Sequence, residues 1–469
     1  MKILNNGTIN SLKKEVSLVS LVFQSVTHMA PGFSVVFAIS ASAVFAAGSM
    51  TLSVLIAAIA IFLLAFSVRQ LARKYPSAGG FYTYGIKALG PRVGFLIGWC
   101  ILLAENITPP IGLWAAAYAA QQILMLFNIN TPFWIWVVLG AVFVYTFMYR
   151  GVAISMKSGV VLGTIEILVF TILSFVFIGK GGSHNTFNVF SPSLAAHGWS
   201  GVFQGMIWAI FAFIGFEAVV PMAEEAQRPQ FASRAVIWGP IVVGVFYLLT
   251  SYAVTIALGV NHAAQLNSDT WINLSSKISS VVEFIVLFAV MNSSLALVMS
   301  SASAATRVMY AMGRDKTLPT AFASVHPTFG TPTFAILFQA ALSVIFTIII
   351  GIWLGGPLNA IGWTGEIVTL LVIIGYYIFG GAVSTLVVYT RDFKSERRII
   401  PHIVIPVVAI ILMFFPLYAS VIPLPAYPLS LGPLIALIWI VVGILISFTS
   451  GINSKIHTMS SNKSTQAEI

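Results

Sequence analysis

The chain has 469 residues, of which 58% are apolar and only 8% are charged. A soluble domain carries about 25% charged residues, so this composition excludes a water-soluble globular protein and indicates an integral membrane protein. The net charge of +10 does not indicate nucleic acid as a partner, because the basic residues gather at the ends of apolar segments, as membrane topology requires.

Twelve apolar segments are long enough to cross a bilayer, since a spanning helix needs about 20 mostly apolar residues. We therefore expect an all-α membrane protein with about 12 transmembrane helices. The predicted spans are 17–47, 51–75, 94–127, 131–149, 154–178, 201–222, 236–258, 281–309, 332–353, 361–389, 403–422 and 429–448.

The distribution of basic residues predicts the topology. With both termini in the cytoplasm, every Lys and Arg except Lys180 and Lys277 falls on the cytoplasmic side, which is 21 of the 23. This is the positive-inside bias of multi-pass proteins, and it predicts a location in the cell membrane. The partners that we expect are the lipid bilayer and a small-molecule substrate, with the protein as a monomer or homodimer.

The spans divide the chain into five parts. A cytoplasmic tail (1–16) precedes two blocks of five spans (17–198 and 199–398), and a pair of spans follows (399–449). The polar, Ser-, Asn- and Lys-rich end (450–469) is predicted to be disordered.

Two spans contain helix breakers near their middle. Span 1 carries Pro31 and Gly32, and span 6 carries Gly215 beside Glu217. Proline removes a backbone donor, and glycine weakens a helix by roughly 1 kcal/mol. A simple kink explains either site alone. Both spans, however, come first in a block of five, which is typical of inverted-repeat transporters with a midplane substrate site.

Four glutamates lie within apolar spans: Glu105, Glu166, Glu217 and Glu366. An ionised side chain at the bilayer centre costs about 2.5–3.5 kcal/mol, so each faces a cavity or a partner, or is protonated. A protonated, hydrogen-bonded structural role is the alternative for each. His28 is either a pH-responsive group or a hydrogen-bonded filler at the kink.

Three motifs resemble the amino acid–polyamine–organocation (APC) family, in its amino acid transporter branch. They are YPSAGGFY at 75–82, FIGFE at 213–217 followed by EEAQRP at 224–229, and RVMYAMGRD at 307–315 followed by LP at 318–319. The resemblance covers all the spans. It implies a leucine-transporter-type fold, in which two inverted five-helix repeats contain broken helices 1 and 6.

The resemblance also implies a substrate site at the two breaks, with Phe211 as an aromatic gate over the substrate. The implied substrate-binding residues are Met29, Ala30, Pro31, Gly32, Glu105, Phe211, Phe213, Ile214 and Gly215. The implied coupling or gating residues are Glu166, Glu217 and Asn292. Span 1 lacks the family's usual glycine–serine–glycine pattern, and Glu166 stands where several members have a lysine.

The leading hypothesis is a proton-coupled secondary active importer of amino acids, which works by alternating access, with sodium as the alternative coupling ion. A polyamine or amine carrier or exchanger is the alternative, favoured by the additional acids Glu105 and Glu366. A membrane enzyme with buried carboxylates is the rival from another class. We find no HExxH pair, nucleophile elbow or phosphate loop, and Cys100 is the only cysteine, so no catalytic residue, cofactor or metal site is predicted.

Overall fold

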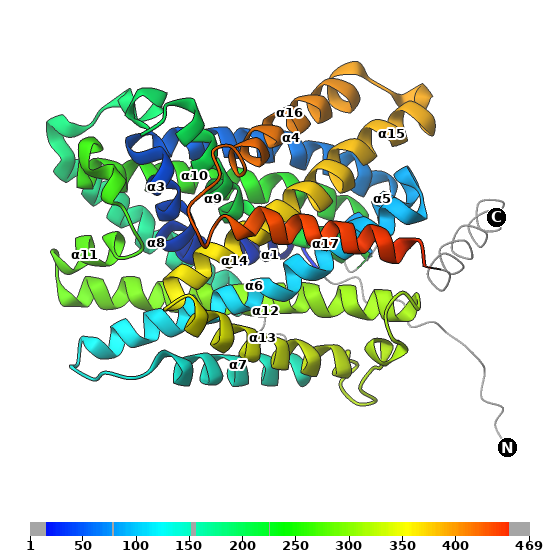
Figure 1. Ribbon diagram of the computed structural model, residues 1–469, viewed down its shortest axis with the longest axis horizontal. Helices are drawn as coiled ribbons and strands as arrows, with labels where there is room; N and C mark the ends of the chain where they lie inside the picture. The colour runs from blue at the N-terminus through cyan, green and yellow to red at the C-terminus, as the bar shows by residue number, and fades with distance from the viewer. Residues whose placement is uncertain (1–15, 77–78, 152–155, 225, 450–469) are drawn as a thin grey trace.

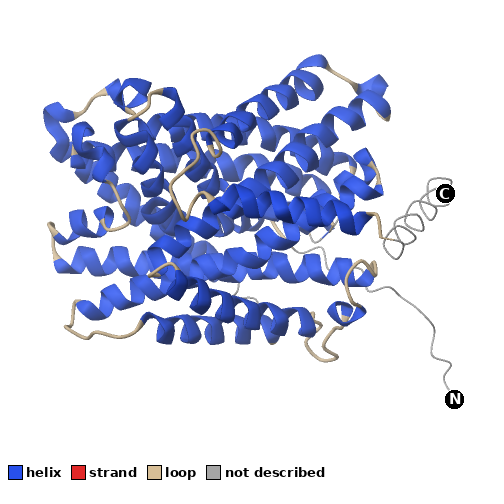
Figure 2. Ribbon diagram, viewed as in Figure 1, coloured by secondary structure: helices blue, strands red, loops and turns tan. Residues whose placement is uncertain are grey.

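The computed structural model describes residues 16–76, 79–151, 156–224 and 226–449. The predicted disordered tail at 450–469 and nearly all of the tail at 1–16 lie outside these residues. Within the described ranges the regular structure is helical (Figures 1 and 2), apart from one isolated parallel bridge between Val16 and Ala226. This confirms the all-α class.

The first half of the chain forms a series of helices separated by short turns. Their bounds are α1 Leu18–Met29, α2 Pro31–Phe33, a π-helix Ser34–Ile39, α3 Ser40–Ala46, α4 Met50–Lys74, α5 Gly80–Leu89, α6 Pro91–Met125, α7 Phe133–Tyr149 and α8 Met156–Gly181.

The second half continues in the same way. Its bounds are α9 Trp199–Phe213, a 3-10 helix Phe216–Glu224, α10 Pro229–Leu258, α11 Thr270–Ser276, α12 Ser280–Arg314, α13 Thr333–Trp353, α14 Pro357–Val372, a π-helix Ile373–Val383, α15 Ser384–Arg391, a π-helix Ile400–Val404, α16 Ile405–Ala419 and α17 Leu431–Ser447. Short 3-10 turns occupy much of the connections.

In the described residues, nine helical segments are long and apolar enough to cross a membrane. The first of them, Leu18–Lys74, has 57 residues, whereas about 20 suffice for one crossing. It is interrupted at Ala30, and again at Ala47, where φ is 43° and α3 ends. Two shorter apolar helices, Phe133–Tyr149 and Leu431–Ser447, complete the set.

The helices differ in how much of each is covered by the rest of the protein. The most apolar stretch of Trp199–Ala223 is 89% buried and that of Pro91–Met125 is 83% buried, but that of Ile400–Ala419 is only 28% buried. In Figure 1, α7 and α16 lie at opposite edges of the view, with α1, α6 and α14 between them. The outer helices expose apolar side chains, as expected where lipid is the solvent, and the central ones position the polar site.

Candidate functional site

The first interruption lies between α1 and α2. Ala30 adopts a left-handed conformation, with φ 44° and ψ 72°, and Pro31 has no N–H to donate to the preceding turn. The freed carbonyl of Met29 accepts from Ser34 Oγ at 2.8 Å, and the Tyr247 hydroxyl lies 3.0 Å from it. The helix is therefore broken, and side chains satisfy its open carbonyl.

The second interruption follows α9. Ile214 is extended, with ψ 131°, and Gly215 has φ 110°. A Cβ at Gly215 would lie 2.4 Å from His28 Cδ2. Two independent features therefore require glycine at this position: the positive φ of the backbone and the close approach of the His28 ring.

Side chains connect the two interruptions. Tyr247 on α10 places its hydroxyl 3.0 Å from Met29 O and 2.9 Å from Ala212 O, one carbonyl beside each break. Ser25 on α1 donates from Oγ to Phe216 O at 2.9 Å. The two broken helices therefore form one polar unit inside an apolar bundle.

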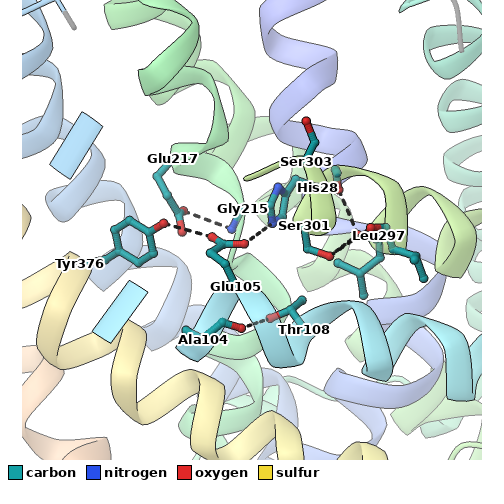
Figure 3. Close-up of polar contacts among 12 residues, drawn as sticks. His28, Ala104, Glu105, Thr108, Gly215, Glu217, Leu297, Ser301, Ser303 and Tyr376 are labelled. Atoms are coloured by element: carbon teal, nitrogen blue, oxygen red, sulfur yellow. Dashed lines mark hydrogen bonds and ion pairs between the residues drawn. The ribbon is translucent and has the colours of Figure 1, made fainter. Parts of the chain in front are cut away.

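A cavity of about 860 Å³, counted with its opening, reaches this unit. Its buried end is lined by His28, Glu105, Gly215, Glu217 and Tyr376. Its outer end is lined by residues of α5 and of the last turns of α12, among them Tyr82 and Arg307. Figure 3 shows Tyr376, Glu105, Glu217 and His28 directed toward one another around Gly215.

The polar groups at the buried end are only partly paired. Tyr376 donates to Glu105 Oε1 at 3.0 Å, and the Gly215 N–H donates to Glu217 Oε2 at 3.1 Å. Glu105 Oε2 lies 4.0 Å from His28 Nε2, which is too far for a direct hydrogen bond. Within the described residues, neither this oxygen nor either ring nitrogen of His28 has a hydrogen-bond partner.

Glu166 on α8 forms a second polar cluster beside the first break. Ser293 Oγ lies 3.3 Å from Glu166 Oε1, and Asn292 Nδ2 lies 3.4 Å from Glu166 Oε2. Glu166 is 3% exposed and is not among the residues that line the cavity.

Aromatic rings pack on the opposite side of the breaks from the cavity's outer end. Phe211 contacts Phe33 edge to face with ring centroids 6.2 Å apart, Phe33 lies against Phe37, and Phe37 lies against Tyr118. Tyr118 donates in turn to Asp269, just before α11. We call Phe33, Phe37, Tyr118 and Phe211 the aromatic layer.

The structure distributes the predicted site residues over these regions. Glu105, Gly215 and Glu217 line the cavity, and Phe211 lies in the aromatic layer. The remaining residues form the backbone of the breaks or the second cluster: Met29, Ala30, Pro31, Gly32, Phe213 and Ile214 in the former, and Glu166 and Asn292 in the latter. Glu366 lies elsewhere, in a smaller cavity beside Gln204 and Trp208.

Two residues at the site were not predicted from the sequence, Tyr376 and Tyr247. Each is a tyrosine within an apolar run, and in a chain with 13% aromatic residues such positions look like ordinary packing. A tyrosine that is fully inside a span must find a partner for its hydroxyl, and that is the one signal that could have singled them out.

Comparison with known proteins gives consistent results. The family model described as amino acid permease matches residues 15–448. The branched-chain amino acid permease of Bacillus subtilis (strain 168) is 25% identical over 467 residues, which cover 93% of each protein. The low-affinity putrescine importer of Escherichia coli (strain K12) is 27% identical over 359 residues, which cover 71% of this chain and 74% of the importer.

A solved structure shares the fold. A mutant of the manganese transporter of Eremococcus coleocola superposes with a TM-score of 0.63 at 13% identity, covering 97% of this chain and 100% of that chain. This likeness concerns the fold alone. The family model, in contrast, spans nearly the whole chain and confirms the family expected from the three motifs, so the protein belongs to the amino acid permease family and is a multi-pass membrane transporter, not an enzyme.

Proposed function

We propose that the protein is a secondary active transporter that imports a small amino compound across the cell membrane by alternating access, with a proton as the driving ion. One observation carries the proposal: a cavity reaches Gly215 at the second break and His28, two residues before the first break, from one end of the bundle, and the aromatic layer lies beyond the breaks. A substrate site at the breaks that is open to one side only is what alternating access needs.

The proposed architecture has twelve spans. Dividing the 57-residue segment Leu18–Lys74 into two spans at Ala47, and adding the two shorter apolar helices, gives this number. The interrupted helices α1 and α9 then come first in two blocks of five. This correspondence supports a leucine-transporter-type pair of inverted repeats followed by two further spans.

The proposed orientation has both termini in the cytoplasm, from the distribution of basic residues. The cavity's outer end, near Arg307, then faces the cytoplasm, and the conformation is inward-facing.

Single cysteines in place of Lys180 and Lys277 should react with an impermeant thiol reagent on intact cells, and one in place of Lys394 should not. The native Cys100 is buried. Labelling at Lys394 from outside would contradict the twelve-span topology.

Two substrate classes are candidates. Amino acids are favoured by the family and by the relative from Bacillus subtilis, which is named as a branched-chain amino acid permease. Amines are favoured by the two glutamates in the cavity and by the relative from Escherichia coli, which is named as a putrescine importer.

We assign the binding of the driving ion to the Glu166 cluster, because a buried carboxylate with hydroxyl and amide partners suits a proton.

The test uses the purified protein in proteoliposomes with an imposed pH gradient, alkaline inside, and labelled amino acids or amines outside. We expect uptake that rises with the gradient and is abolished by a protonophore. A sodium gradient without a pH gradient is the control. Uptake that follows sodium and ignores pH would contradict proton coupling, and uptake of neither class under any gradient would contradict the transport proposal.

A further inference from the structure

A backbone donor at the second break, the Gly215 N–H, is already occupied by a side chain of the protein. An unwound helix offers free N–H groups, which are natural partners for a substrate carboxylate. Here the Gly215 N–H donates to Glu217 Oε2 at 3.1 Å. Pro31 has no N–H. A carboxylate of the protein thus stands where a carboxylate of the substrate would bind.

The neighbouring backbone donors are used within the helices. Ala30 donates to Val26 O at 3.1 Å, and Ile214 donates to Phe211 O at 3.1 Å. These are the N–H groups immediately before Pro31 and Gly215, so neither break presents them to a ligand. To bind its carboxylate at the Gly215 N–H, an amino acid substrate would have to displace Glu217 or leave that carboxylate beside this glutamate.

The unpaired groups at the buried end of the cavity suit an ammonium instead. Glu105 Oε2 and His28 Nε2 lie 4.0 Å apart, and both are without a partner among the described residues. An ammonium has three donors and no acceptor, and one nitrogen placed to the side of the line that joins the two atoms can lie about 2.9 Å from both. A neutral imidazole accepts one such bond.

Neighbouring groups hold both acceptors in place. Tyr376 donates to the other oxygen of Glu105 at 3.0 Å and so fixes the carboxylate, and the His28 side chain lies close against Gly215. Of the charged side chains that line the cavity, Glu105 and Glu217 lie at the buried end and Arg307 at the exposed end. A cationic head group is therefore drawn inward.

We propose that the substrate is an organic amine without an α-carboxylate, bound at its ammonium group by Glu105 and His28. This inference rests on the proposed transport function and narrows its substrate class. In this proposal Glu105 selects amines. Glu217 occupies the Gly215 N–H, which is the backbone donor that a substrate carboxylate would otherwise use.

The test compares pairs of compounds that differ only by a carboxylate. The full-length protein, purified in detergent, is titrated by thermal unfolding at pH 7 with putrescine against ornithine, isobutylamine against valine, and histamine against histidine. We expect at least one pair in which the amine binds with a Kd at least tenfold lower than that of its amino acid. Tighter or equal binding of the amino acid in every pair that binds would overturn the proposal.

Variants test the assigned residues. Glu105→Gln removes the charge and keeps the shape, and it should weaken amine binding at least tenfold. Glu283→Gln, at the first turn of α12 and outside the cavity, is the matched control and should change nothing. Glu217→Ala frees the Gly215 N–H. It should bring the Kd of the amino acid closer to the Kd of the corresponding amine. Folded Glu105→Gln protein with unchanged amine affinity would remove Glu105 from the site.

The outcomes separate this inference from the transport proposal. Gradient-driven uptake of amino acids that is unaffected by Glu105→Gln would overturn the amine assignment and leave transport intact. Amine binding without gradient-driven uptake of any compound would do the reverse. Binding of no member of any pair would contradict the amine site, and if Glu105→Gln does not fold, the pair preference of the unmodified protein decides the class.

Discussion

The two polar clusters at the helix breaks differ in how completely their carboxylates are paired. Glu166, beside the first break, meets Ser293 and Asn292 and does not line the cavity. Glu105, near the second break, receives one hydrogen bond from Tyr376 and turns its other oxygen toward His28 inside the cavity. We call the Glu166 cluster closed, because its carboxylate has side-chain partners and lies outside the cavity. We call the Glu105 cluster open, because one of its carboxylate oxygens is unpaired among the described residues and lies in the cavity.

This difference separates two tasks. A closed cluster with several short-range partners has room for a proton or a bare ion but not for an organic molecule. An open cluster that lines the cavity presents an acceptor, unsatisfied within the described part of the chain, to a substrate that enters it. The contrast supports assigning the driving ion to Glu166 and the substrate to Glu105.

Tyr247 supplies a physical link between the two clusters. Its hydroxyl lies within hydrogen-bond distance of one carbonyl at each break, so the breaks cannot separate without losing one of these contacts. Coupling between sites requires such a shared element with more than one arrangement.

The largest effect is expected from Gly215→Ala, which disrupts the open cluster. An alanine at φ 110° is strained by about 1–3 kcal/mol, and its Cβ would overlap the His28 ring. We expect a lower Tm and loss of substrate binding, measured by thermal unfolding of the purified protein.

The control is Gly179→Ala on α8, where an added Cβ meets no atom within 4 Å. Alanine is favoured over glycine in a helix by about 1 kcal/mol, so this variant should be neutral or stabilised. Wild-type Tm and binding in Gly215→Ala would show that the second break has a different geometry.

A smaller effect is expected from Tyr247→Phe, which cuts the link between the clusters. Leaving a buried carbonyl without a partner costs about 1–3 kcal/mol, and the Tm should fall accordingly. Substrate exchange in proteoliposomes should slow as well, because both breaks lose a contact.

Tyr252→Phe, five residues further along α10, is the matched control. The Tyr252 hydroxyl donates to Asn185 in a partly exposed position, where water can replace the bond, so exchange should be unchanged. Equal effects of the two substitutions on exchange would argue that Tyr247 has no role beyond packing.

The sequence predicted the positions of the breaks and the class of the fold, because both depend on local chemistry. Pro31 and Gly215 act on their own backbone, and a span is recognised from its own apolar residues. The predicted second span, 51–75, agrees with α4, Met50–Lys74, within one residue at each end.

The pairing of the clusters could not be predicted, because it depends on contacts between distant helices. Glu166 meets Ser293 across 127 positions of the chain, and Tyr376 meets Glu105 across 271. Neither partner carries a local signal, since serine and tyrosine are common in membrane helices. The sequence therefore identified the acids but not which of them share a cavity.

The smallest effect, and the one most specific to the closed cluster, is expected from Glu166→Gln. The amide keeps the shape of the side chain and mimics the protonated acid, so substrate binding and exchange should persist. Gradient-driven accumulation of the substrate, in contrast, should be lost. One coupled proton in a pH gradient of one unit contributes about 1.4 kcal/mol, which corresponds to tenfold accumulation at zero membrane potential. Proteoliposomes with the potential clamped should show this tenfold accumulation for the unmodified protein and none for Glu166→Gln. If the variant still accumulates substrate tenfold, Glu166 serves only the packing of α8 against α1 and α12, and the driving ion must bind elsewhere. If Glu105→Gln abolishes accumulation while keeping affinity, the two clusters have exchanged roles.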